Sequence, residues 1–303
     1  MNKSFLQTEE WLTFQKSVGN NAWRFDDGKI AANIIRHRLP FGMNYLYIPH
    51  GPAIDFNAIS GSINDEIAQF VSYLKKLARE ERSIFIKMEP LDDKVPEALH
   101  HFKFKKSAKE IQPDRSIIID LEKPEYDLLG AMHHKTRYNI KVAERNNLKF
   151  VTGNNIDAFW SLLKRTAKND NFSTHPQEYY EKLCSTPDLK VEMVFVQHEG
   201  VAIAGAVLLA YGDTVYYLHG AMDRDTKYKP MMAPYLLHWE VMKWAKGYSM
   251  KYYDLWGIDA KKWPGVTRFK LGWGGRQVEY PGAFDMSIRG FWFLMYKILR
   301  KIF

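Results

Sequence analysis

Residues 132–148 read MHHKTRYNIKVAERNNL, and this stretch is the most informative in the chain. Read as a helix, it places Arg137, Lys141 and Arg145 in one i, i+4, i+8 row, with apolar residues on another face. Such a row presents fixed positive charge in one direction. Residues 265–280, GVTRFKLGWGGRQVEY, form a second basic segment that is rich in glycine. Together the two segments suggest an enzyme that handles phosphate-rich substrates.

The composition is that of a folded, basic protein. A length of 303 residues favours about two domains, and 46% apolar residues with 15% aromatics can build sizeable cores. The net charge of +8 fits a nucleic acid, acidic lipid or anionic metabolite as partner, although a basic protein without such a partner has the same charge. Cys184 is the only cysteine, so no disulfide can form within the chain, which fits a reducing cytosol. We expect Cys184 to serve packing rather than catalysis.

Both ends of the chain bear on location. The N-terminus has no apolar run after its first basic residue, so it is not a signal peptide, and no window approaches the ~20 apolar residues of a spanning helix. The C-terminal segment Ile288–Phe303 predicts an amphipathic helix, either docked on the core or lying at a membrane interface. Its apolar stripe contains Phe291, Trp292, Met295, Leu299 and Ile302, and its opposite cationic side contains Lys297, Arg300 and Lys301.

Hydrophobic periodicity predicts mixed α/β structure in both halves of the chain. In the first half it predicts helices at 11–16 and 67–82 and strands at 29–35, 45–49, 83–89 and 115–121. In the second half it predicts helices at 157–168, 176–184 and 233–246 and strands at 191–198, 202–211, 214–218 and 252–256. The similar order suggests a duplicated module, although no residue-level repeat is visible.

Seven short motifs occur along the chain in an order that is typical of one protein family. The chain resembles the Fem family (FemA, FemB and FemX) of peptidoglycan bridge-forming aminoacyltransferases. The motifs extend over almost the whole chain, and any one of them is weak. In order they are FLQTEEWLTFQK (5–16), YIPHGPAIDF (47–56), HKTRYNIKVAERNNLKF (134–150), STHPQEYYEKL (173–183), YYLHGAMD (216–223), YDLWGI (253–258) and GVTRFKLGWGG (265–275).

The resemblance implies an α/β (α+β) fold of two acetyltransferase-like (GNAT) domains packed across a cleft. We expect one domain at 1–113 plus 282–303 and the other at 114–281, without the long helical arm of some family members. The implied activity moves an amino acid from aminoacyl-tRNA to the stem-peptide amine of a peptidoglycan precursor, either lipid II or UDP-MurNAc-pentapeptide. The implied protein is a monomer in the bacterial cytoplasm, at the inner face of the membrane. It has no cofactor besides aminoacyl-tRNA as co-substrate.

The resemblance also implies site residues. Lys270 is the expected catalytic cation, for the developing oxyanion or a tRNA phosphate, and the backbone of Phe269 is expected to bind a substrate by strand-like hydrogen bonds. Acceptor binding is expected at Gln15, Lys16, His175, Tyr179, Tyr216 and Tyr217. His175 stands where the family has an arginine for the pyrophosphate, and Gln15 stands where it has a lysine. The basic residues Lys135, Arg137 and Lys141 are expected to meet tRNA phosphates.

Other chemistries have weaker support in the sequence. The ten histidines lack the spacing of a zinc site, so we expect no metal. Asp254 near the WGI turn is a less favoured candidate base. One alternative is an acyl-CoA-dependent GNAT N-acyltransferase, but residues 224–234, RDTKYKPMMAP, lack the glycines of a pyrophosphate cradle. Another is a noncatalytic RNA- or membrane-binding protein, which the basic helix and the basic aromatic tail would also serve.

Overall fold

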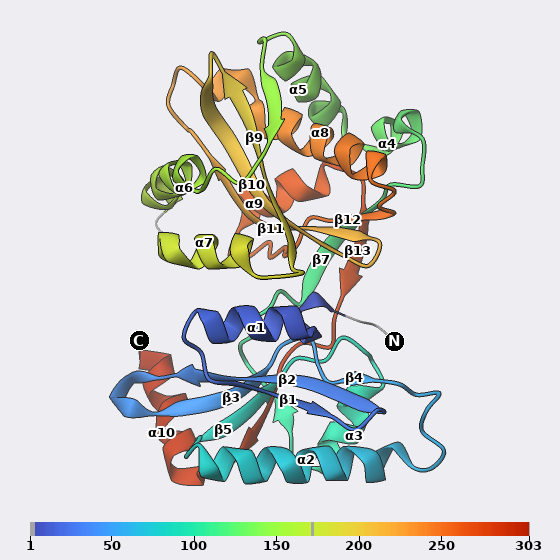
Figure 1. Ribbon diagram of the computed structural model, residues 1–303, viewed down its shortest axis with the longest axis vertical. Coiled ribbons are helices and arrows are strands. Elements are labelled where there is room, and N and C mark those ends of the chain that lie inside the picture. The colour runs from blue at the N-terminus through green and yellow to red at the C-terminus, as the bar shows by residue number, and fades with distance from the viewer. Residues whose placement is uncertain (1–3, 171–172, 303) are drawn as a thin grey trace. The chain divides into compact units, whose positions relative to one another are not determined.

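The computed structural model describes residues 4–170 and 173–302, and the chain divides into two compact units. Unit 1 consists of Met1–Asp114 with Glu279–Phe303, and unit 2 consists of Arg115–Val278. The chain therefore leaves unit 1 once and returns to it at its C-terminal end (Figure 1). Within the described ranges, no helix combines the length and the apolar composition needed to cross a bilayer.

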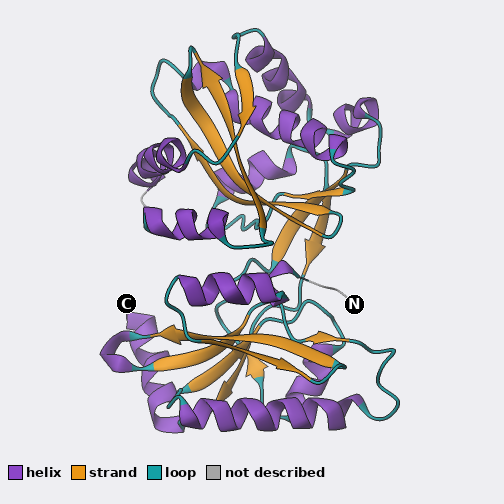
Figure 2. Ribbon diagram, in the orientation of Figure 1, coloured by secondary structure: helices purple, strands orange, loops and turns teal. Residues whose placement is uncertain are grey.

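Unit 1 is a seven-stranded mixed sheet between two layers of helices (Figure 2). The strand order is β1-β2-β3-β5-β14-β6, with β4 paired to β2, and only β3 and β5 run parallel among the registered pairs. Helix α2 buries Phe70 and Leu74 against one face of the sheet, as its apolar stripe predicts. The elements are α1 (Glu9–Ser17), β1 (Ala22–Asp26), β2 (Ile30–Arg38), β3 (Asn44–Ile48), β4 (Ala53–Ile54), α2 (Ile63–Glu80), β5 (Phe85–Met88), α3 (Val95–His101), β6 (Lys105–Lys106), β14 (Phe284–Ser287) and α10 (Gly290–Ile302).

Unit 2 is a second seven-stranded sheet, with the order β13-β7-β12-β11-β10-β9-β8. Helices α5 and α8 share one core with the sheet, and α6 contacts β10 and β11. The elements are β7 (Arg115–Asp120), α4 (Glu125–Ala131), α5 (His134–Glu144), β8 (Lys149–Thr152), α6 (Ile156–Asp170), α7 (Gln177–Ser185), β9 (Lys190–His198), β10 (Val201–Tyr211), β11 (Thr214–Met222), α8 (Ala233–Gly247), β12 (Tyr252–Asp254), α9 (Pro264–Leu271) and β13 (Arg276–Glu279).

The two sheets follow one topological plan, which agrees with the predicted duplicated module. In unit 1 the antiparallel series β1-β2-β3 is followed by helix α2 and the parallel strand β5. In unit 2 the antiparallel series β9-β10-β11 is followed by helix α8 and the parallel strand β12. The strand beyond this parallel pair comes from far along the chain in both units. It is β14 in unit 1 and β7 in unit 2.

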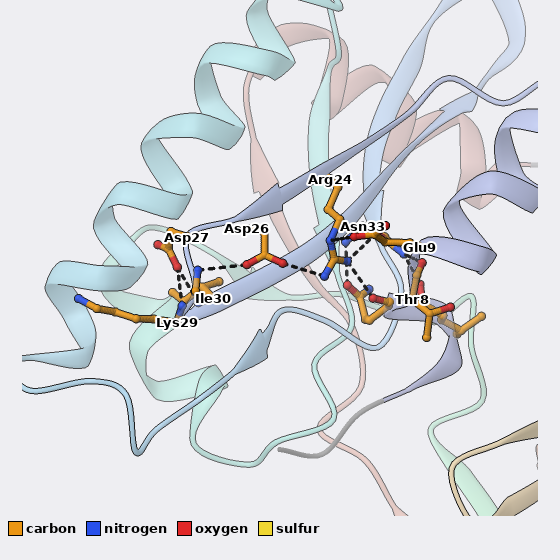
Figure 3. A network of polar contacts seen from close by, with 11 residues as sticks. Thr8, Glu9, Arg24, Asp26, Asp27, Lys29, Ile30 and Asn33 are labelled. Atoms are coloured by element: carbon orange, nitrogen blue, oxygen red, sulfur yellow. Dashed lines mark hydrogen bonds and ion pairs between the residues drawn. The ribbon is translucent and has the colours of Figure 1, made fainter. Parts of the chain in front are cut away.

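A network of polar contacts joins the start of the chain to the β1–β2 hairpin (Figure 3). The guanidinium of Arg24 donates to the Gln7 carbonyl at 3.0 Å and pairs with the Asp26 carboxylate at 2.9 Å. The amide of the buried Asn33 donates to the Thr8 carbonyl at 2.6 Å. These bonds tie the β1–β2 hairpin to backbone carbonyls at the α1 entry, where the Thr8 carbonyl also accepts from the Leu12 N–H at 3.2 Å.

Helix boundaries in the basic stretch differ from the prediction. The single helix predicted over 132–148 is too long, because α5 covers only His134–Glu144. Met132 and His133 are extended, with ψ of 149° and 142°, so the chain turns between α4 and α5. Asn147 has a φ of +50°, which ends any continuation of the helix. Arg145 therefore caps the helix instead of continuing its basic row.

The C-terminal helix docks on the core, one of its two predicted placements, but by residues outside the predicted apolar stripe. Helix α10 docks on unit 1 through Phe293 and Tyr296, which pack with Phe85. The predicted stripe residues Phe291 and Trp292 are exposed instead. The docking site is an aromatic cluster on β3 and β5, and the sequence of the helix alone does not show which of its sides fits this cluster. The side chains of Lys301 and Ile302, and all of Phe303, lie outside the described residues.

Candidate active site

Lys270 is a buried ammonium inside a helix of unit 2. Helix α9 begins at Pro264, a residue suited to the first helical turn, and places Lys270 one residue before its end. The side chain is only 8% exposed, and its Nζ donates to the carbonyl oxygens of Trp256 and Gly257, the latter at 2.8 Å. Burial lowers the pKa of Lys270 to about 8, and the Asp254 carboxylate opposes this fall. Lys270 is therefore a buried cation held in a fixed position, and not a surface lysine on a strand pair.

The carbonyls that face Lys270 belong to a strained turn after β12. Trp256 has a φ of +53°, which side chains other than glycine rarely adopt, and Gly257 follows at +21°. Asp254 is buried and accepts hydrogen bonds from the Trp256 N–H at 2.8 Å and from the Ser116 hydroxyl. Burial raises the pKa of Asp254, while these hydrogen bonds and Lys270 oppose the rise. Asp254 thus acts on the turn, which fits a structural role better than the weakly favoured role of base.

An aromatic wall completes the surroundings of the ammonium. The ring centre of Tyr217 lies 5.7 Å from the Lys270 Nζ and 4.6 Å from the ring of His238. The His238 Nδ1 is hydrogen-bonded to the Tyr253 hydroxyl at 2.9 Å, and burial lowers the pKa of His238 to about 3, so this imidazole is neutral. A Cβ at Gly220 would overlap the Tyr217 hydroxyl, so a residue larger than glycine at this position would displace the Tyr217 side chain.

The other predicted tyrosine reaches the same turn. Tyr216 packs edge-to-face on Trp256 at a ring distance of 5.7 Å. Tyr216 and Tyr217 point to opposite faces of β11, because side chains alternate along a strand. The structure therefore brings Lys270, Tyr216 and Tyr217 around one turn. Trp256 and His238 were not among the predicted site residues, and the only sequence signal for Trp256 was its place in the YDLWGI motif.

The strand-like hydrogen bonds predicted for the Phe269 backbone are wrong. Phe269 lies within α9, where its carbonyl accepts from the Gly272 N–H at 3.2 Å. Its ring packs on Tyr235 at 5.1 Å and on Trp273 at 6.0 Å. Phe269 therefore holds the helix that carries Lys270. The prediction failed because a glycine-rich segment gave no sign of its helix.

A second aromatic cluster surrounds His175. Its ring stacks on Tyr179 at 3.9 Å with an interplanar angle of 9°, and the His219 ring from β11 lies 6.1 Å from both. Burial lowers the pKa of His175, and it lowers the pKa of His219 to about 4. The imidazole of His175 is therefore largely neutral at pH 7. His219 was missed, although it lies in the quoted YYLHGAMD motif.

The two remaining predicted acceptor residues lie on α1 in unit 1. Gln15 is buried, and its Oε1 accepts from the Asn20 side chain at 2.8 Å. Lys16 is exposed. The side-chain oxygen of Gln15 is thus engaged by a residue just after its own helix, whereas the Lys16 side chain is exposed.

The three predicted tRNA contacts differ in their surroundings. Lys135 and Lys141 are exposed on α5. The Arg137 guanidinium is half-buried and donates to the carbonyls of Leu129, at 3.3 Å, and Met132 at the end of α4. This bonding satisfies orphan carbonyls of a helix C-terminus and gives Arg137 a structural task.

Two further chemistries can be judged from the described part of the chain. It contains no group of three His, Cys, Asp or Glu side chains that could hold a metal ion. Cys184 is half-buried, and burial raises the pKa of its thiol to about 11, so little thiolate exists at pH 7.

Comparison with solved structures defines the fold. A crystal structure of FemX matches with a TM-score of 0.81 at 20% identity, covering 97% of this chain and 94% of that one. A tandem GNAT protein from the clavulanic acid biosynthesis pathway matches with a TM-score of 0.58 at 10% identity, covering 89% and 83%. The fold is therefore that of two GNAT-like domains, as predicted.

The chain belongs to the FemAB family, whose model matches residues 1–96, 97–199 and 190–301. A lipid II:glycine glycyltransferase from Staphylococcus epidermidis is 24% identical over 373 aligned positions, covering 94% of this chain and 88% of that protein. A UDP-N-acetylmuramoylpentapeptide-lysine N(6)-alanyltransferase from Weissella viridescens is 29% identical over 158 positions, covering 50% and 46%. The resemblance seen in the motifs is thus confirmed.

Proposed function

We propose that the protein transfers an amino acid from aminoacyl-tRNA to the side-chain amine of a peptidoglycan stem peptide. The family and the names of its two relatives, a glycyltransferase and an alanyltransferase, support this reaction. Because one relative is named for lipid II and the other for the UDP-linked pentapeptide, both are acceptor candidates. Charged tRNA is a cytoplasmic molecule, so the proposal places the protein in the bacterial cytoplasm.

The buried ammonium of Lys270 is the observation that carries the proposal. In the reaction the acceptor amine attacks the ester carbonyl, the bond to the ribose oxygen breaks, and a proton passes from the amine to that oxygen. Negative charge builds on the carbonyl oxygen meanwhile. Two of the three N–H donors of Lys270 are engaged by Trp256 and Gly257, which fixes the direction of the third. A fixed donor in a water-poor site stabilises such charge without reorganising.

The reaction can be tested with charged tRNAs and both precursors, followed by mass spectrometry of the muropeptide product. We expect Lys270→Met to lower kcat by about 10²–10³, the usual effect of removing one oxyanion donor. Lys261→Met removes an exposed lysine near the same helix and should change nothing. Acetyl-CoA in place of charged tRNA should give no product. Full transfer by the Lys270→Met protein, or transfer from acetyl-CoA, would overturn the assignment.

The tRNA surface on α5 has its own test. Lys135 and Lys141 are exposed, so we propose that each neutralises one tRNA phosphate. Lys141→Gln should weaken tRNA binding and reduce the slope of log affinity against log salt by about one. Glu144→Gln, an exposed change on the same helix, provides the control and should not weaken binding. A salt slope that does not respond to Lys141→Gln would remove this helix from the tRNA surface.

A further inference from the structure

The C-terminal helix α10 presents an apolar face that unit 1 leaves uncovered. Phe291, Leu294 and Ile298 are 69%, 57% and 45% exposed, and Trp292 is 43% exposed. The inward face is held by Phe293, which is 7% exposed in the aromatic cluster of β3 and β5. Helix α10 is therefore fixed in place by one side while its other side offers large apolar groups to solvent. Exposed apolar groups in such a contiguous set indicate an interaction surface.

A neighbouring hairpin extends this surface. The turn between β2 and β3 carries Phe41, which is 88% exposed and has a φ of +61°. Leu39 and Met43, on either side of it, pack against the same aromatic cluster as Phe293. The end of the β2–β3 hairpin and α10 lie at one edge of unit 1 (Figure 1). We call Phe41, Phe291, Trp292, Leu294 and Ile298 the tail patch.

Cations surround the tail patch, and carboxylates are missing from its segments. Residues 38–45 and 288–302 contain no Asp or Glu. The Lys297 Nζ lies 4.4 Å from the Phe293 ring centre, and the Arg289 guanidinium lies 5.9 Å from that of Trp292. Arg38 is also exposed beside the hairpin turn. Long basic side chains that cover aromatic rings can keep their charged ends in a polar layer while their stems lie on apolar groups.

We propose that the tail patch binds the surface of an anionic lipid bilayer, with α10 lying in the plane of the interface. The 13 residues of α10 span about 20 Å, which is too short to cross the ~30 Å hydrocarbon core but suits an interfacial helix. The basic rim matches the charge of acidic headgroups. A second copy of the chain fits less well, because a symmetric contact between these segments offers no carboxylate to pair with Arg289 and Lys297.

Vesicle sedimentation of the full chain tests this proposal. We expect binding to vesicles of phosphatidylglycerol and phosphatidylcholine, weaker binding to phosphatidylcholine alone, and weakening with added salt. Leu294→Gln with Ile298→Gln should lower the affinity for the mixed vesicles at least about tenfold, since two apolar side chains no longer enter the interface. Tyr248→Gln, which removes an exposed aromatic residue from unit 2, is the matched control and should bind as the unaltered protein does.

Two readouts make the outcome decisive. Circular dichroism and thermal melting should be the same for all three proteins, because the changed side chains are exposed. Equal vesicle binding by the double variant and the unaltered protein would overturn the proposal. A lack of vesicle binding, with self-association in sedimentation equilibrium that the double variant abolishes, would also overturn it and assign the patch to a second copy. Neither readout depends on aminoacyl transfer, so the result stands apart from the proposed reaction.

Discussion

The depressed pKa of Lys270 predicts a rise in stability at alkaline pH. Below pH 8 the lysine is charged in both the folded and the unfolded chain, so the free energy of folding includes the full cost of burying the ammonium. Between about 8 and its ordinary value of 10.5, the unfolded chain holds one more proton than the folded chain, so the free energy of unfolding rises with pH. A pKa difference of one unit is worth about 1.4 kcal/mol, so the rise amounts to about 3 kcal/mol.

The assay is urea unfolding of the unaltered protein and of Lys270→Met at a series of pH values. Methionine does not titrate, so subtracting its curve cancels every other ionisable group. We expect the difference to be flat below pH 8 and then to increase by about 3 kcal/mol by pH 10.5. A difference that stays flat across this range would mean that the ammonium is hydrated. A difference that falls would mean that ion pairing outweighs burial, and either result would refute the reasoning.

Three further substitutions test packing and polar contacts by thermal melting or denaturant unfolding. Gly274→Ala should destabilise the protein by about 3 kcal/mol or more, because its φ is +75° and a Cβ would overlap a backbone carbonyl, whereas Gly247→Ala has open space and should change little. Arg137→Ala should cost about 1–2 kcal/mol by uncapping α4. Lys87→Met should cost about 3–5 kcal/mol by leaving Asp285, its buried partner at 2.7 Å, without a counter-charge, and Asp285→Asn in addition should restore part of the loss.

Much of the fold could be predicted because its longest elements carry a clear periodicity. The apolar stripe of α2 and the alternating or continuous apolar runs of β9 and β10 have the periods of the structures they form. Short elements were missed where that signal is weak. Helix α9 has eight residues next to glycines, so neither its helix nor the orientation of Phe269 could be predicted. The β12 strand ends early at Asp254, because the positive φ of Trp256 is set by the site and not by local preference.

The candidate site could be predicted by residue type but not by environment. Motif order pointed to Lys270, Tyr216 and Tyr217, which the structure brings around one turn. The burial of Lys270 depends on packing between α9 and the end of β12, which are contacts made only after folding. The cap that Arg137 forms on α4 is likewise a contact between elements. The sequence of a row of basic residues therefore does not show which of them face solvent and which contact other segments of the chain.

The position of β14 has a consequence for biosynthesis. This strand lies inside the sheet of unit 1, between β5 and β6, yet it is made only after all of unit 2. Unit 2 is complete once Val278 has left the ribosome, whereas the older unit 1 still lacks an inner strand. We therefore expect nascent chains arrested just beyond unit 2 to protect that later segment from protease while their earlier residues remain cleavable. A premature stop between Val278 and β14 should thus prevent folding of unit 1, although most of that unit was translated before unit 2.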